Sequence, residues 1–254
     1  MFRFSFTRAV CAWVLAALAG AAGAAEPPIR IVTEEFPPYN LTENGRITGL
    51  STEVVEAVLK EVGAAAPIQS MPWARAYDIA LNGENVLIYS ITRTAMRDKL
   101  FKWVGVVAPS DWYLFSRADH PVTLGKLDDA KAYQTATVNE DAGEQYLVSK
   151  GFVIGKNLQS SNKYEFNYEK LRLGRVDMWV SNELNAYYLV RQAGDNPHTV
   201  LSPALLLDDI SRDGGGLDMA FSLKTPDAVV ERFRKALETI KKNGTYESLQ
   251  KKWL

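Results

Sequence analysis

Short apolar runs alternate with helical patterns along this chain, and this alternation constrains its fold more than any other feature. In each helical pattern apolar residues recur at spacings of three and four, and the pattern stops at a glycine. Strands and helices in this order predict a mainly parallel sheet with helices on its faces. In the first part of the chain we expect strands at 29–33 and 86–89 and helices at 54–62 and 73–81.

The same alternation restarts near Trp112 and predicts a second α/β unit inside the chain. An irregular stretch at 203–217 follows that unit. Its triple glycine, Gly214–Gly216, is interpreted as a flexible part of a hinge. Two such units joined by a flexible return predict two lobes with a hinged cleft between them. We expect the remaining strands at 133–138, 176–180 and 219–223, the second unit's helices at 140–150, 164–173 and 183–192, and helix starts at Ser51, Pro72 and Thr225.

The first 25 residues are expected to be a secretory signal peptide. Arg3 and Arg8 give a basic start, an apolar run follows, and small residues allow cleavage near Ala24 or Ala25. Cys11 lies in that run, so cleavage removes the only cysteine and excludes disulfides, Cys nucleophiles and thiolate metal sites. We therefore expect a soluble protein exported to the periplasm.

The charge balance of the mature chain argues against nucleic acid and membrane partners. Loss of the two leader arginines leaves 27 basic residues against 30 acidic ones, a net charge of −3. No later apolar run approaches the roughly 20 residues that a membrane span needs. His120 and His198 are isolated from carboxylates in the sequence, so we expect no metal site and no cofactor.

A polar turn directly after the apolar run 86–89 is the strongest candidate for a binding site. Ser90, Thr92 and Thr94 place hydroxyls at the carboxyl end of the predicted strand, and Arg97 follows them. Ligands of open α/β sheets bind at that edge, and a guanidinium pairs with a carboxylate through two parallel hydrogen bonds. An isolated arginine is more often a surface charge, so the case for Arg97 depends on the neighbouring hydroxyls and on the motifs described next.

Four motifs occur in order along the chain: Gly45 to Leu50, Leu81 to Arg97, Gly174 to Asp177 and Lys242 to Trp253. Together they resemble the family 3 periplasmic solute-binding proteins, which are the amino-acid-type binding components of ABC importers. A divergent branch is matched best, with Pro-Trp-Ala-Arg-Ala at 72–76 and Phe-Lys-Trp-Val-Gly at 101–105. The resemblance implies a two-lobe type II periplasmic binding protein fold with a hinged cleft. Lobe 1 would hold residues 26–115 and 216–254, and lobe 2 residues 116–215.

The resemblance also implies ligand contacts. The carboxylate-binding arginine of the family falls on Arg97, and its amine-binding aspartate is replaced here by Asn182, a neutral amide that cannot neutralise an ammonium. An amino acid, a carboxylate without an amine, and a short peptide-like or cyclic amine compound therefore stay open. The other implied contacts are Ser90, Thr92, Thr94, Tyr39, Trp73 and the helix start from Asn139 to Asp141. Arg75 and Glu35 are added as neighbours of this edge that could equally face solvent.

We expect a monomeric binding protein that delivers a small solute to an ABC permease in the inner membrane. Two alternatives stay open. One is an exported enzyme of the cyclohexadienyl or arogenate dehydratase type, with Glu35, Asp141 or Glu183 as its acid. The other is a ligand-sensing subunit of a signalling receptor. The identity of the solute and the docking surface are not encoded in any motif found here.

Overall fold

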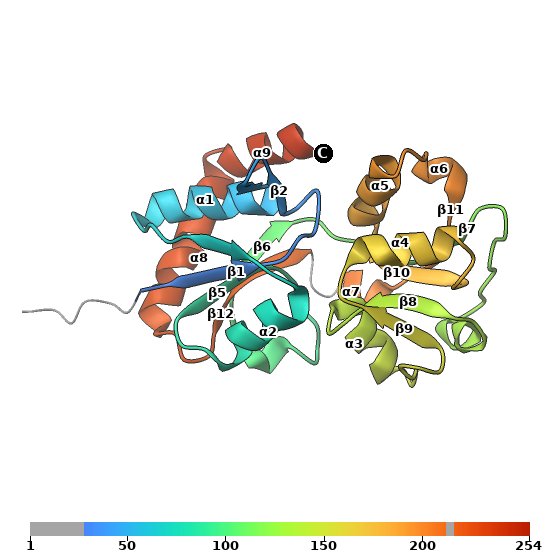
Figure 1. The fold of residues 1–254 in the computed structure, drawn as a ribbon. Coiled ribbons are helices and arrows are strands. Elements are labelled where there is room, and N and C mark those ends of the chain that lie inside the picture. Colours follow the sequence, from blue (N-terminus) through green and yellow to red (C-terminus); the bar gives the residue numbers. More distant parts are fainter. Residues whose placement is uncertain (1–27, 212–215) are drawn as a thin grey trace, which may run out of the picture.

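The computed structural model describes residues 28–211 and 216–254. The expected signal peptide and two of the three hinge glycines, Gly214 and Gly215, lie outside these residues. Figure 1 shows two lobes side by side, each built on its own five-stranded sheet with helices on both faces. The two-lobe α/β fold expected from the sequence is confirmed. Among the residues described, no helix is long and apolar enough to cross a membrane.

The first sheet has the strand order β4-β1-β5-β12-β6. Strand β1 pairs in parallel with β4 and β5, and β12 enters between β5 and β6 in the antiparallel direction. All seven residues of β5 are buried, as expected for a central strand covered on both faces. The elements are β1 (Arg30–Thr33), β2 (Leu41–Glu43), β3 (Arg46–Thr48), α1 (Leu50–Val62), β4 (Ile68–Ser70), α2 (Trp73–Asn82), β5 (Val86–Thr92), β6 (Phe101–Ala108), β12 (Leu217–Ser222), α8 (Asp227–Lys242) and α9 (Thr245–Trp253).

The second sheet has the strand order β11-β7-β10-β8-β9. Strand β10 pairs in parallel with β8 and antiparallel with β7. Helices α3, α4 and α5 begin at the end of this lobe that faces the first lobe (Figure 1). The elements are β7 (Trp112–Arg117), β8 (Thr135–Val138), α3 (Ala142–Ser149), β9 (Leu158–Ser161), α4 (Tyr164–Arg172), β10 (Met178–Asn182), α5 (Glu183–Gln192), α6 (Pro197–Val200), β11 (Leu201–Leu206) and α7 (Asp208–Ser211).

Several local expectations were wrong. The stretch expected to be irregular contains β11 and α7. Gly49 and Pro226, not Ser51 and Thr225, are the residues that precede α1 and α8, and the Thr225 hydroxyl bonds instead to that of Ser222. Strand β7 pairs along its whole length with β10 and β11 of the second sheet.

Gly49 holds the loop before α1 against the start of that helix. Its φ angle is 115°, and a Cβ atom there would lie 2.4 Å from the carbonyl oxygen of Tyr39. That carbonyl accepts the N–H of Ser51, and the Pro38 carbonyl accepts the N–H of Leu50. The helix start therefore fixes the loop that carries Tyr39 toward the second lobe.

We predict that Gly49→Ala lowers the free energy of unfolding by about 2–4 kcal/mol, because the new methyl group meets backbone atoms and the φ angle is unfavourable for alanine. Gly45→Ala is the matched control. Its φ is 78° and the space around its Cβ is open, so only the conformational cost of about 1–2 kcal/mol applies. Urea unfolding of both variants measures the difference, and equal losses would show that the contact with Tyr39 contributes nothing.

Candidate functional site

Arg97 lies between the two lobes and is 1% exposed. Its Nη1 donates to the Thr92 carbonyl of its own lobe over 3.3 Å. Its Nε donates to Gln145 Oε1, and its Nη2 donates to the Glu140 carbonyl, both over 2.9 Å and both into the second lobe. The guanidinium also lies over the rings of Trp73 and Tyr77, at 5.2 and 4.9 Å from their centroids. The Arg97 guanidinium thus contacts β5 and α2 of the first lobe and α3 of the second.

Two residues with left-handed backbone conformation shape this region. Ser90, inside β5, has φ 59°, and Glu140, just before α3, has φ 61°. Neither is a glycine, and such conformations are uncommon and cluster at functional sites. The Glu140 carbonyl accepts hydrogen bonds from both Arg97 and Trp73 Nε1, the latter over 2.7 Å. The conformation of Glu140 therefore serves contacts between the lobes.

Two buried carboxyl groups lie beside Arg97 in the cleft. Glu34 follows β1 in the first lobe, and Asp141 is the N-cap of α3 in the second. They are 5% and 2% exposed. Tyr164, the first residue of α4, donates to Glu34 Oε1 over 3.4 Å. Among the described residues neither carboxylate forms an ion pair with Arg97, whose hydrogen bonds go to neutral acceptors.

Burial dominates the ionisation of both acids. It raises the pKa of Glu34 well above its usual range, and the nearby Asp141 raises it further. Burial likewise raises the pKa of Asp141 from 3.8 to about 7, although the N–H of Glu144 stabilises its charged form. The neighbouring Glu144 carboxylate adds to the rise. The cleft therefore disfavours two simultaneous negative charges at these positions.

These groups enclose a cavity of only about 10 Å³, which has room for about one water molecule. A second cavity of about 260 Å³ lies next to it and shares three of its side chains, Glu34, Trp73 and Tyr164. The lobes are thus closed on each other, and a solute must separate them to enter. The small cavity is lined by Glu34, Phe36, Trp73, Ser90, Thr92, Arg97, Trp112, Asp141, Ala142 and Tyr164.

Further hydrogen bonds hold the lobes together. The Tyr39 hydroxyl donates to Asn182 Oδ1 over 2.8 Å, and Asn185 Nδ2 donates to the Pro37 carbonyl over 2.8 Å. Asn182 is also the N-cap of α5, and its Nδ2 donates to Ser110 Oγ. Its polar atoms are therefore committed to protein partners in this closed arrangement.

The ten predicted contacts fall into three groups. Four of them, Arg97, Ser90, Thr92 and Trp73, line the small cavity together. Tyr39 and Asn182 pair with each other beside it, and Glu35 lines the outer cavity, where it accepts hydrogen bonds from Thr42 and Ser70. The others lie apart from the small cavity: Arg75 and Asn139 are exposed, and Thr94 lines a separate cavity of about 200 Å³ with Met96 and Tyr146.

Glu34 and Tyr164 line the cavity but were not predicted, whereas Asp141 was expected as the last of the second-lobe contacts at 139–141 and as a candidate catalytic acid. A sequence signal existed for Glu34, because it is the first residue after β1 and so occupies the same sheet edge as the Ser90 region. No such signal existed for Tyr164, because it follows β9, a strand without an apolar run.

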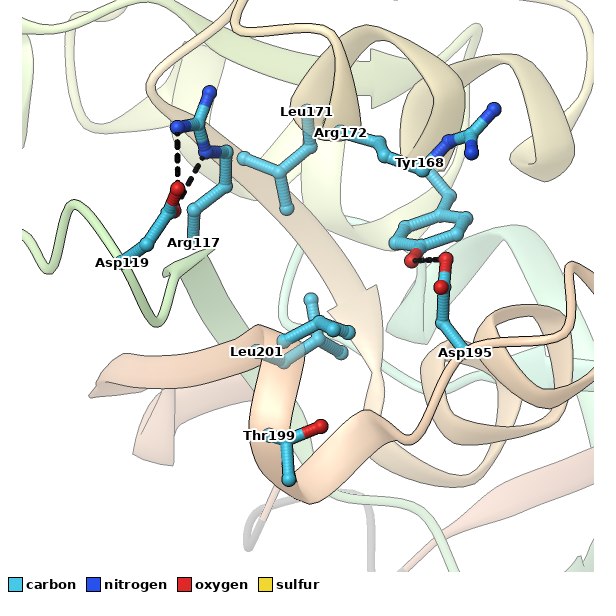
Figure 2. A pocket seen from close by; sticks show the side chains of 9 residues that line it. Arg117, Asp119, Tyr168, Leu171, Arg172, Asp195, Thr199 and Leu201 are labelled. Atoms are coloured by element: carbon cyan, nitrogen blue, oxygen red, sulfur yellow. Dashed lines mark hydrogen bonds and ion pairs between the residues drawn. The ribbon is translucent and has the colours of Figure 1, made fainter.

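A larger cavity, of about 430 Å³, lies within the second lobe and is lined by residues of α4, α6, β7 and β11. Figure 2 shows that its polar groups pair with one another, Arg117 with Asp119 and Tyr168 with Asp195. The small cavity differs, since Asp141 Oδ2 and Trp112 Nε1 on its wall are buried and have no hydrogen-bond partner. Buried polar atoms without a partner call for an explanation, and a ligand supplies one. We therefore place the candidate site between the lobes.

Comparisons with known proteins identify the family of the chain. Residues 29–254 match the model of a family described as bacterial extracellular solute-binding proteins, family 3. The arginine-binding periplasmic protein of Mannheimia haemolytica is 25% identical over 236 residues, which cover 89% of this chain and 90% of that protein. The L-cystine-binding protein TcyJ of Escherichia coli (strain K12) is 21% identical over 220 residues, covering 86% and 79%.

A solved structure shares the fold of this chain. The sensor domain of a histidine kinase, described as similar to periplasmic binding proteins, superposes with a TM-score of 0.77 over 90% of this chain and 96% of its own. The two chains are 20% identical, so this likeness concerns the fold.

We predict that Asp141 makes folding less favourable as the pH rises from about 4 to 7. Asp141 has a higher pKa in the folded than in the unfolded chain, so in this range the folded protein binds more protons, and each rise in pH favours unfolding. Asp141→Asn keeps an N-cap residue and should reduce this loss by roughly 1–3 kcal/mol. Denaturant unfolding at several pH values tests it.

Asp218→Asn is the control that separates an acid in the cleft from a buried acid elsewhere. Burial also raises the pKa of Asp218 to about 7, but this residue belongs to β12 of the first lobe and lines neither cavity of the cleft. Its effect should add to that of Asp141→Asn. An unchanged pH profile in Asp141→Asn would contradict the assignment of a retained proton to the cleft.

Proposed function

The chain belongs to the bacterial extracellular solute-binding proteins of family 3, and we propose that it captures a small polar solute with a carboxylate group, an amino acid or a related compound, between its lobes. The observation that carries this proposal is the buried Arg97, whose guanidinium reaches from one lobe to the other. Relatives named for binding arginine and cystine support a solute of this size and polarity.

The proposed chemistry is charge pairing without a covalent step. Gln145 Oε1 and the Glu140 carbonyl occupy two donors of Arg97 in the closed protein. A solute carboxylate takes the place of these neutral acceptors and makes stronger, charge-assisted bonds. The polar groups of Ser90 and Thr92 and the ring of Trp73 complete the proposed contacts on the cavity wall.

The solute requires the lobes to open, because the enclosed cavity holds about 10 Å³. We propose lobes of residues 26 to about 115 with 216–254, and of about 116–215. The pairing of β7 with the second sheet supports a first crossing nearer to 109–111. Closure then buries the solute and brings Tyr39 onto Asn182.

We propose that the monomeric protein works in the periplasm and delivers its solute to an ABC permease of the inner membrane. The periplasmic relative from M. haemolytica supports this location. Recovery of the bound solute unchanged, by native mass spectrometry of protein purified without denaturation, tests the absence of a covalent step. Conversion of prephenate or arogenate by the pure protein would instead support the dehydratase alternative.

We predict that Arg97→Ala weakens solute binding by about 2–5 kcal/mol, or about 30-fold or more, because the carboxylate loses its buried partner. Isothermal titration with a solute found in a thermal-shift panel of amino acids, amines and carboxylates measures the change. Arg172→Ala is the matched control. This arginine lines the cavity of Figure 2 and pairs with Glu169 at the surface, so its loss should leave the affinity unchanged.

Two results would refute the proposed site. Arg97→Ala could bind as tightly as the natural protein while folding normally. Alternatively, Arg172→Ala could be the variant that loses affinity, which would move the site to the second lobe.

A further inference from the structure

The indole N–H of Trp112 is a buried hydrogen-bond donor without an acceptor. Trp112 is the first residue of β7 and is 2% exposed, and its Nε1 has no hydrogen-bond partner among the described residues. A buried indole N–H usually has such a partner. Two tryptophans of the first lobe follow this rule. Trp73 Nε1 donates to the Glu140 carbonyl over 2.7 Å, and Trp103 Nε1 donates to the Asp98 carbonyl over 2.9 Å. The donor of Trp112 therefore calls for an explanation.

The packing around Trp112 holds its ring in place. Its backbone N–H donates to Ser211 Oγ over 2.8 Å, and its carbonyl accepts the N–H of Leu207 over 2.8 Å. The ring stacks on that of Phe36 from the first lobe, with centroids 6.3 Å apart. Its benzene edge lies against Gly143 of α3, where a Cβ atom would come within 3.2 Å of Cζ3. Because of these contacts the indole cannot turn toward an acceptor elsewhere in the closed protein.

Trp112 lies at the proposed solute site. It lines the small cavity together with Arg97, and the two residues belong to opposite lobes. The Tyr164 hydroxyl lies close to both acids of the wall, and neither Glu34 nor Asp141 accepts from Trp112. When the lobes separate, water can hydrate the indole N–H, and closure removes that water. An acceptor must then come from the solute, because a buried donor without a partner opposes closure.

We infer that Trp112 Nε1 donates a hydrogen bond to an oxygen atom of the bound solute. The inference rests on the proposed function and adds to it a specificity-determining residue, which is absent from the ten contacts predicted from the sequence. Arg97 then binds the solute from the first lobe and Trp112 from the second. The solute thus joins the two lobes through polar contacts on both sides.

The chemistry of the indole limits which solutes fit. Its N–H can only donate, and it carries no charge. It can therefore bind an anionic or a neutral oxygen, but it stays unpaired against a methyl or N–H group of the solute. A site built to form a hydrogen bond discriminates strongly against a compound that cannot form it. Loss of the N–H should weaken binding of the correct solute and reduce the difference between solutes.

Trp112→Phe removes the N–H and keeps an aromatic ring on Phe36. The probes are the twenty standard L-amino acids, succinate and glutarate, and the tightest binder found by thermal shift is used for titration calorimetry. We expect Trp112→Phe to bind that probe about 10- to 100-fold more weakly than the natural protein, because one buried hydrogen bond is lost. In the natural protein labelled with ¹⁵N, saturation with the same probe should move the NMR signal of the Trp112 indole proton downfield.

Trp179→Phe is the matched control. Trp179 lies in β10 of the same lobe, is fully buried, and also has an Nε1 without a partner among the described residues. It lines neither cavity of the cleft. Its replacement should leave the affinity unchanged, and its indole signal should keep its position when the probe binds.

Unchanged affinity in a normally folded Trp112→Phe variant would overturn the inference. A loss of affinity without movement of the Trp112 indole signal would also overturn it, because the effect would then come from ring packing. The proposed function would survive either result if Arg97→Ala still abolished binding of the same probe. Binding of no probe would count against both.

Discussion

The hydrogen bonds that Arg97 makes across the cleft are the interaction on which the rest of this site depends. A guanidinium that is 1% exposed needs acceptors on every side, and these come from both lobes. Because Gln145 and the Glu140 carbonyl belong to the second lobe, the cation is fully satisfied only when the lobes are closed or when another molecule supplies the acceptors. A solute anion in the open cleft is such a molecule.

The acids around Arg97 make closure of the empty cleft unfavourable. Glu34 and Asp141 come from opposite lobes, so closing brings two carboxyl groups into one buried space of about 10 Å³. Their mutual repulsion and their loss of water oppose closure unless a proton or a cation joins them. Closure therefore depends on what neutralises these acids as well as on what binds Arg97.

Much of the fold and part of the site follow from the sequence in physical terms. The fully buried β5 appears as a continuous apolar run, and its hydroxyl-rich end leads directly to Arg97. Strands such as β4 and β9 were missed because short strands at the edge of a sheet carry few apolar residues. Glu34 and Tyr164 were missed, and Asp141 was expected only as the end of a range of second-lobe contacts, because the meeting of these three side chains depends on the closed arrangement of the lobes. No spacing along one chain segment encodes that arrangement.

A crystal structure of the protein with its bound solute tests the central claim most directly. The account predicts a solute carboxylate within about 3 Å of the Arg97 guanidinium, in the place of Gln145 Oε1 and the Glu140 carbonyl. A solute bound elsewhere, for example between Arg117 and Tyr168 in the cavity of Figure 2, with Arg97 still bonded to Gln145, would contradict it.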